Sequence, residues 1–209
     1  MKVGIIDYEV GNIFSVANAI SYLGHVPIIS RSRNELISCD KIILPGVGNF
    51  SKASAKLEEY ELSEIIKDFI RTGKSFLGIC IGMHLLMENS DESVGSSGLG
   101  IIKGTVKKIT DTKETNKKII IPHVCWSKVN FKSEIFKDFS ADDFYYFVHS
   151  YTVVPQNNET ILGRTKYFDI DINAAIKMEN LIGVQFHPER SGPSGLKFLR
   201  NFIEKEIIS

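Results

Sequence analysis

The first 90 residues alternate between short apolar runs and stretches in which apolar residues recur at helical spacing. The apolar runs have the length of buried strands, and they cover 2–6, 26–30, 41–44 and 76–79. The helical patterns cover about 13–23, 51–60, 63–72 and 81–88. Such alternation predicts a parallel sheet with helices on its faces. Ligands of these sheets bind outside the carboxyl ends of the strands, so we expect Asp7, the 45–50 loop and Cys80 to meet at one rim.

The second half of the chain shows a series of shorter strand patterns separated by polar turns. They cover 103–109, 118–122, 144–154, 159–166, 172–178 and 181–186. A long amphipathic helix ends the chain, with Leu196, Leu199, Phe202 and Ile203 on one side. Because no linker or repeat divides the sequence, we expect one α/β domain over residues 1–209. Its mostly parallel, mixed central sheet carries helices on both faces and an antiparallel β extension.

Composition limits the classes of partner and compartment. The 209 residues include 25 basic and 25 acidic side chains, a balance that does not favour nucleic acid or a membrane as partner. Three cysteines without a CxxC pair argue against a disulfide framework or a zinc site, and we expect neither metal nor cofactor. Asp7 comes too early for the apolar core of a signal peptide, and no apolar stretch is long enough for a bilayer. We therefore expect a cytoplasmic protein.

The segment L-G-I-C-I-G at 77–82 places Cys80 between a strand and a helix, with glycines two residues away on both sides. This pattern is typical of a nucleophile on a sharp strand-to-helix turn, where glycines permit a strained backbone and close approach by a substrate. The start of a helix adds partial positive charge, which favours a thiolate. Taken alone, such a cysteine is more simply an inert thiol, as we expect for Cys39 and Cys125, which lack this turn.

A second motif supplies the groups that a nucleophilic cysteine needs. L-I-G-V-Q-F-H-P-E at 181–189 is a strand pattern that leads to His187, and Glu189 follows after one proline. The glutamate could accept a hydrogen bond from the imidazole and fix its tautomer, and the imidazole could take the proton from Cys80. The two motifs together predict a Cys80–His187–Glu189 triad for covalent catalysis.

The loop L-P-G-V-G-N-F at 44–50 follows the third predicted strand. It lacks the lysine and Ser/Thr of a P-loop and the spacing of a dinucleotide fingerprint, so we do not expect it to bind phosphate. Its glycines could instead turn backbone N–H groups toward an oxyanion, together with the amide of Ile81 after the nucleophile. The alternative is a tight turn that enters a helix, and glycine content alone does not separate the two.

Six segments in the same order resemble the class I (triad) glutamine amidotransferases over nearly the whole chain. They cover 5–16, 44–50, 77–86, 121–126, 146–151 and 183–192. More narrowly, the early D-Y-x-x-G-N and the central P-H-x-x-W resemble the glutaminase subunits of imidazole glycerol phosphate synthase. The resemblance implies an enzyme that hydrolyses glutamine to glutamate and channels ammonia to a (β/α)8-barrel synthase subunit, its heterodimer partner in histidine biosynthesis.

The resemblance also implies a role for each matching residue. Cys80 attacks the carboxamide of glutamine to form a glutamyl thioester, His187 acts as base and then acid, and Glu189 orients His187. The oxyanion donors are the amides of Gly48 and Ile81. The implied substrate-binding residues are Gly46, Gly48, His84, Ser150 and Tyr151. The positions that face the barrel partner are Pro122, His123, Trp126, Tyr146 and Arg190.

The chain departs from the family pattern at several of these positions. His84 stands where the family usually has glutamine, Glu9 and Cys125 stand where it has glycine, Ser127 replaces asparagine, and Arg190 replaces lysine. Two alternatives therefore stay open: a paralogous subunit that supplies ammonia for a bacterial surface sugar, and a non-catalytic subunit with a decayed pocket, against which the intact triad counts. A cysteine peptidase on a similar scaffold is disfavoured by the narrower motifs.

Overall fold

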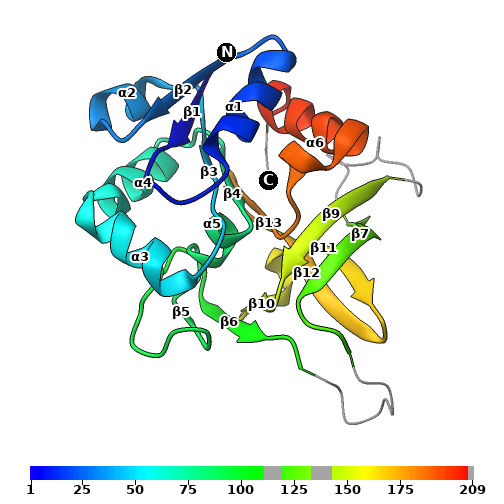
Figure 1. The fold of residues 1–209 in the computed structure, drawn as a ribbon. Helices are drawn as coiled ribbons and strands as arrows, with labels where there is room; N and C mark the ends of the chain where they lie inside the picture. The colour runs from blue at the N-terminus through cyan, green and yellow to red at the C-terminus, as the bar shows by residue number, and fades with distance from the viewer. Residues whose placement is uncertain (111–118, 133–142, 207–209) are drawn as a thin grey trace.

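A computed structural model of the chain describes residues 1–110, 119–132 and 143–206. Its centre is an eight-stranded mixed sheet, shown in Figure 1, with the order β2–β1–β3–β4–β13–β12–β11–β8. The parallel half contains β1 (Lys2–Ile6), β2 (Val26–Ser30), β3 (Lys41–Leu44), β4 (Phe76–Ile79) and β13 (Leu181–Val184). The antiparallel half contains β12 (Ile170–Met178), β11 (Ile161–Tyr167) and β8 (Asn130–Phe131). The predicted mixed α/β sheet is confirmed.

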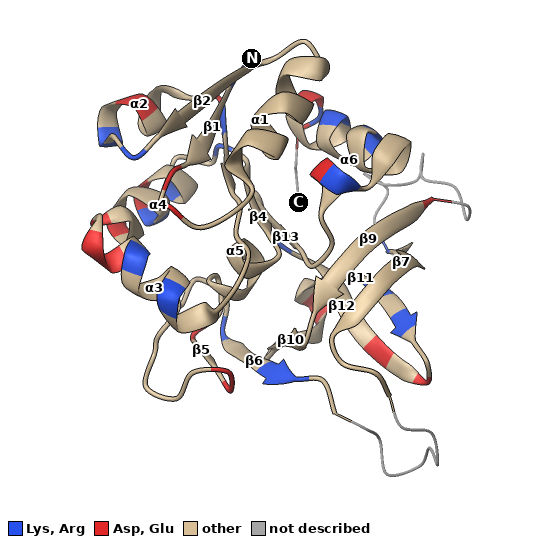
Figure 2. Ribbon diagram, viewed as in Figure 1, with Lys and Arg blue, Asp and Glu red and all other residues tan. Residues whose placement is uncertain are grey.

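Helices cover both faces of the parallel half. On one side lie α1 (Ile13–Tyr22) and α6 (Gly192–Glu204), and on the other lie α2 (Arg33–Ser38), α3 (Phe50–Glu59) and α4 (Leu62–Arg71) (Figure 1). Figure 2 shows charged residues along α2, α3 and α4, while the buried residues of α3 and α4 recur at helical spacing, so one face of each of these two helices packs inward. The longest described helix, α6, has 13 residues. Within the described ranges no helix is long and apolar enough to cross a membrane.

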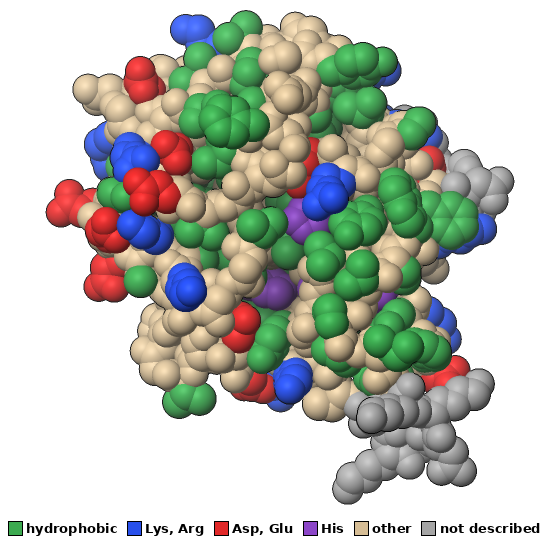
Figure 3. Space-filling view, viewed as in Figure 1, with side chains coloured by type: hydrophobic (Ala, Val, Ile, Leu, Met, Phe, Trp, Pro, Cys, Tyr) green, Lys and Arg blue, Asp and Glu red, His purple; other side chains and the backbone are tan. Residues whose placement is uncertain are grey.

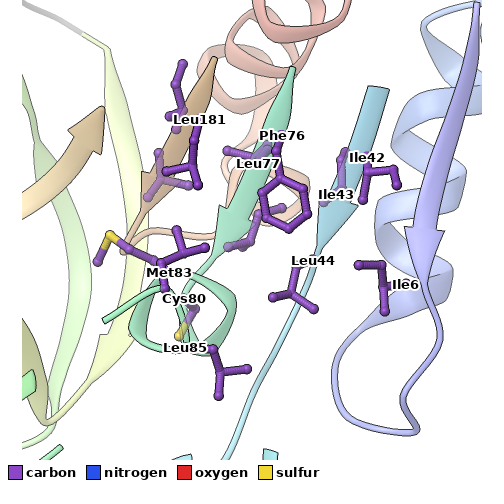
Figure 4. Close-up of a cluster of buried hydrophobic side chains, with 14 of the residues drawn as sticks. Ile6, Ile42, Ile43, Leu44, Phe76, Leu77, Cys80, Met83, Leu85 and Leu181 are labelled. Carbon is purple, nitrogen blue, oxygen red and sulfur yellow. The ribbon is translucent and has the colours of Figure 1, made fainter. Parts of the chain in front are cut away.

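Strand β4 is buried along its whole length, which explains its continuous apolar sequence F-L-G-I. Phe76 and Leu77 pack in the core with side chains of β3 and β13, as Figure 4 shows. Cys80 follows directly and leads into α5 (Ile81–His84). A Cβ atom on Gly82 would lie 1.9 Å from the carbonyl oxygen of Leu44, so only glycine lets α5 pack this closely against β3. The core therefore fixes the turn that carries Cys80.

The second half of the chain differs in detail from the predicted strands. Residues 119–122 contain no strand; the strand forms just after them as β7 (His123–Lys128), which pairs antiparallel with β9 (Phe144–His149). A separate small sheet contains β10 (Tyr151–Pro155), β6 (Gly104–Lys108) and β5 (Asn89–Ser90). The predicted strand 144–154 is thus interrupted at Ser150, and α5 ends four residues earlier than the predicted 88.

Candidate active site

Cys80 occupies the predicted sharp turn between β4 and α5. Its backbone has φ of 54° and ψ of −108°, a conformation that side-chain-bearing residues rarely adopt and that persists only where the surroundings enforce it. The Cys80 amide donates to the carbonyl of Val184 at 2.7 Å. The amides of Met83 and His84 donate back to the Cys80 carbonyl at 2.9 and 3.1 Å. Two neighbouring strands and the first helical turn therefore hold the thiol at the carboxyl end of the sheet.

His187 reaches the same rim because β13 pairs in parallel with β4. Its Nδ1 lies 2.9 Å from Oε1 of Glu189, and the two side chains are only 3% and 2% exposed. A carboxylate accepts hydrogen bonds, so Nδ1 carries a proton and Nε2 is free to exchange one with Cys80. Burial lowers the pKa of His187, but the Cys80 and Glu189 side chains outweigh burial and raise it to about 10. The imidazole is therefore suited to hold the proton of the thiol.

Cys80 and His187 line a cavity of about 280 Å³, and Glu189 lies outside its wall, bound to His187. Other predicted site residues that line it are Gly48, Ile81, His84, Ser150, Tyr151 and Pro122. Figure 3 shows histidine side chains inside a hollow on this face, with hydrophobic side chains around it. The break between β9 and β10 brings Ser150 and Tyr151 to the cavity, because the chain changes sheets there.

The glycine-rich loop lies beside the nucleophile. Burial raises the pKa of Tyr8, which keeps its hydroxyl protonated, and this hydroxyl donates to the Pro45 carbonyl at 2.6 Å. A Cβ atom on Gly46 would lie 2.5 Å from the Tyr8 oxygen and 2.9 Å from Cβ of Ile81. Gly46 is therefore required for packing behind the turn, and it is not among the residues that line the cavity. Gly48, with φ of 96°, does line it.

One rim residue does not join the site. Asp7 is paired with Arg31 at 3.0 Å and accepts a hydrogen bond from the Glu9 amide at 3.2 Å. It follows β1 at the predicted rim but is absent from the cavity wall, so it takes no part in the site around Cys80. Glu9, where the family has glycine, has φ of 63°, which explains the usual preference for glycine there.

Two functional candidates were missed from the sequence. Glu92 lines the cavity, and its Oε2 accepts a hydrogen bond from the Phe50 amide at 2.9 Å. Gln185 is fully buried, and its Nε2 lies 3.7 Å from Sγ of Cys80. Glu92 sits in an irregular segment without a recognisable motif, whereas the proximity of Gln185 to His187 in the sequence was a usable signal.

The residues predicted on the partner face separate into two groups. Trp126 is 52% exposed, its ring lies 5.9 Å from that of Tyr146, and the Arg190 guanidinium lies 5.1 Å from the Tyr146 ring. These three side chains form a continuous row beside the cavity. His123 is instead fully buried, with Nδ1 2.8 Å from Nε2 of His149, so it cannot contact a partner directly. Its side chain points inward because β7 alternates its faces residue by residue.

The cysteines bear on two sequence predictions, the absence of a disulfide framework and the absence of a zinc site. Cys39, Cys80 and Cys125 are all free thiols. In the part of the chain that the structure describes, no group of three or more His, Cys, Asp or Glu side chains could hold a metal ion. The cavity wall carries a thiol, imidazoles and a carboxylate.

The chain matches known proteins in sequence and in fold. Residues 4–205 match the family model described as "Glutamine amidotransferase class-I". "Imidazole glycerol phosphate synthase subunit HisH" of Methanopyrus kandleri is 44% identical over 200 residues, covering 95% of this chain and 96% of the relative. The protein of the same name from Prochlorococcus marinus is 42% identical over 205 residues, covering 97% and 98%.

Solved structures show the same fold at lower identity. A "Crystal structure of glutamine amidotransferase" superposes with a TM-score of 0.69 at 17% identity and covers 97% of each chain. A chain of PurLQS from Thermotoga maritima superposes with a TM-score of 0.70 at 19% identity, again over 97% of each chain. With the sequence match, the fold and the position of Cys80, the chain belongs to the class-I glutamine amidotransferase family.

Proposed function

We propose that this chain is the glutaminase subunit of an imidazole glycerol phosphate synthase and that it hydrolyses glutamine with a Cys80–His187–Glu189 triad. The observation that carries the proposal is the convergence of a strained cysteine and a carboxylate-bound histidine on one cavity. The names of relatives at 42–44% identity support the assignment to histidine biosynthesis. In this proposal residues 1–209 form one glutaminase domain that works in the cytoplasm.

The reaction follows from the positions of the protons. Nε2 of His187 takes the proton of the Cys80 thiol, and the sulfur attacks the carboxamide carbon of glutamine. The amides of Gly48 and Ile81 stabilise the resulting oxyanion. His187 then returns the proton to the nitrogen as the C–N bond breaks, which releases ammonia and leaves a glutamyl thioester. Water, deprotonated by His187, attacks this thioester and releases glutamate.

The cavity also offers contacts for the ends of the substrate. Glutamine carries an α-ammonium and an α-carboxylate, which need a charged partner and hydrogen-bond donors when they leave water. Glu92 is the carboxylate on the cavity wall that suits the ammonium, and Ser150 and Tyr151 line the same cavity with hydroxyl and backbone groups. His84 completes the proposed pocket. Gly46 shapes it from behind.

The row of Trp126, Tyr146 and Arg190 is the proposed contact with a (β/α)8-barrel synthase subunit. Aromatic and arginine side chains are the ones that dominate binding at protein interfaces. Val124, 50% exposed, extends the apolar part of this surface along β7. A covered cavity keeps ammonia away from water, where it is protonated and loses its nucleophilicity.

The assignment is tested by measuring glutamate release from glutamine with the barrel partner present, for the wild type and for Cys80→Ala. Cys125→Ala is the matched control, because it removes a thiol outside the cavity. We expect loss of activity in the first variant alone. Restored growth of a histidine auxotroph by the chain with its partner supports the histidine pathway, whereas active glutaminase without restored growth supports the surface-sugar alternative.

A further inference from the structure

Gln185 connects the nucleophile to the histidine that replaces the usual family glutamine. It follows β13 and is fully buried. Its Nε2 lies 3.7 Å from Sγ of Cys80, within the range of a hydrogen bond to sulfur. Its Oε1 lies 2.8 Å from Nε2 of His84. One amide side chain therefore joins two residues of the cavity wall, and the described mechanism uses neither contact.

The direction of these hydrogen bonds depends on the ionisation of Cys80. A thiolate can only accept, so it must face the NH2 group of Gln185. The amide oxygen then faces His84 and can only accept from it, which places the ring proton of His84 on Nε2. A protonated thiol could instead donate to the amide oxygen after the amide turns over. Only one orientation of Gln185 is compatible with the reactive sulfur.

This orientation determines what His84 offers to the cavity. Burial lowers the pKa of His84 to about 4, although its hydrogen bond with Gln185 acts in the opposite direction. A neutral ring carries one proton, so Nδ1 is left as an acceptor. Nδ1 is buried and has no hydrogen-bond partner among the described residues, while His84 is 2% exposed and lines the cavity. An unpaired buried acceptor is costly unless a ligand satisfies it.

We propose that Gln185 is a positioning residue that donates to the sulfur of Cys80 and thereby sets His84 to accept a hydrogen bond from an N–H group of the substrate glutamine. The inference rests on the proposed glutaminase function. It explains how histidine can stand in the place of the family glutamine without loss of the pocket. Ionisation of the nucleophile and recognition of the substrate are coupled through a single buried amide.

The test measures alkylation of Cys80 by iodoacetamide, detected by peptide mass spectrometry, with and without glutamine. The alkylation rate reports the reactivity of the sulfur, and the glutamine concentration that halves it reports how far bound glutamine and its thioester occupy Cys80. The holoenzyme with its barrel partner is used throughout. The variants are Gln185→Met, which keeps the shape and removes both hydrogen bonds, His84→Leu and the double variant. Gln156→Met, at an exposed position, is the matched control.

We expect Gln185→Met to slow alkylation about tenfold, because it removes the hydrogen bond to the sulfur. It should also raise the protecting glutamine concentration about tenfold, because it removes the hydrogen bond to the buried ring of His84. His84→Leu should raise the protecting concentration by a similar factor and leave the alkylation rate unchanged, since Gln185 still faces the sulfur. The double variant should bind glutamine no worse than either single variant. A residue with a merely structural role would not separate the two readouts in this way.

The possible outcomes separate this inference from the glutaminase assignment. If glutamine protects the wild type and the Gln185→Met and His84→Leu variants equally, this inference is wrong and the glutaminase assignment stands. If glutamine does not protect Cys80 of the wild type, the assignment fails and the inference fails with it. If Gln185→Met does not fold, His84→Leu still decides whether Nδ1 contributes to binding. Additive losses in the double variant would contradict the coupling.

Discussion

Replacement of Glu189 by glutamine tests the triad because it removes a charge and keeps the shape. The carboxylate lies 2.9 Å from Nδ1 of His187, and both side chains are almost fully buried, so water cannot replace the lost charge. A hydrogen bond to a charged group contributes about 1.5–3 kcal/mol. This bond is at full strength while His187 is positively charged and holds the proton of Cys80. Its loss should lower kcat/KM for glutamine about 10- to 150-fold.

The assay is glutamate release with saturating barrel partner, and Glu64→Gln is the control because that side chain is 68% exposed on α4.

The Glu189→Gln substitution should also alter the pH dependence of stability. The pKa of His187 is raised from 6.5 to about 10 in the folded protein, so its stabilising effect is complete below pH 6.5 and is lost as the pH rises through 10. The wild type should therefore lose more unfolding free energy than Glu189→Gln over this window in urea titrations. Activity within threefold of the wild type, or parallel stability profiles, would refute the reasoning.

Two further substitutions test the packing of the turn and the partner surface. Gly82→Ala places Cβ 1.9 Å from the Leu44 carbonyl oxygen, so α5 must move. We expect about 1–3 kcal/mol of destabilisation in urea unfolding and loss of glutaminase activity. A urea midpoint equal to that of the wild type would contradict this packing. Trp126→Ala, at a side chain 52% exposed, should leave the unfolding free energy of the isolated chain within about 0.5 kcal/mol. It should weaken binding of the barrel partner by about 2 kcal/mol in calorimetry, whereas unchanged affinity would place the interface elsewhere.

The parallel half of the sheet was predictable because its strands and helices carry opposite periodicities. Strand β4 reads as one apolar run, and α4 repeats its buried residues at helical spacing. Helix α2 was missed because its six residues bury only Leu36, too few to show a period. Helix α5 was predicted too long because the apolar residues from Leu85 to Met87 are buried after the helix has ended.

Strand β7 was missed because its pattern is inverted. The side chains that point inward include His123 and Ser127, whereas Val124 and Trp126 are about half exposed. A strand normally buries its apolar face, so this alternation reads as irregular in an isolated chain. An apolar face turned outward is what a subunit surface requires. The difference between sequence and structure here thus points to the same face as the proposed interface.

The candidate site was predictable where residues close together in the sequence determine its geometry. Cys80 with its flanking glycines and His187 with Glu189 are each encoded within a few residues, and β13 beside β4 brings them together. The contact of Gln185 with Cys80 depends on residues more than one hundred positions apart, and its sequence proximity to His187 was the local signal for it. The packing of Gly46 against Tyr8 was not predictable, because the two residues are far apart in the sequence.

The central claim is that Cys80 forms a glutamyl thioester, and rapid acid quenching followed by peptide mass spectrometry tests it most directly. The complex with the barrel partner is mixed with glutamine and stopped within the first turnover. We predict that the peptide containing Cys80 gains the mass of glutamine minus ammonia, and that Cys80→Ala gains no such mass at any residue. A glutamyl adduct on another side chain, or glutamate release by Cys80→Ala at the wild-type rate, would contradict the account.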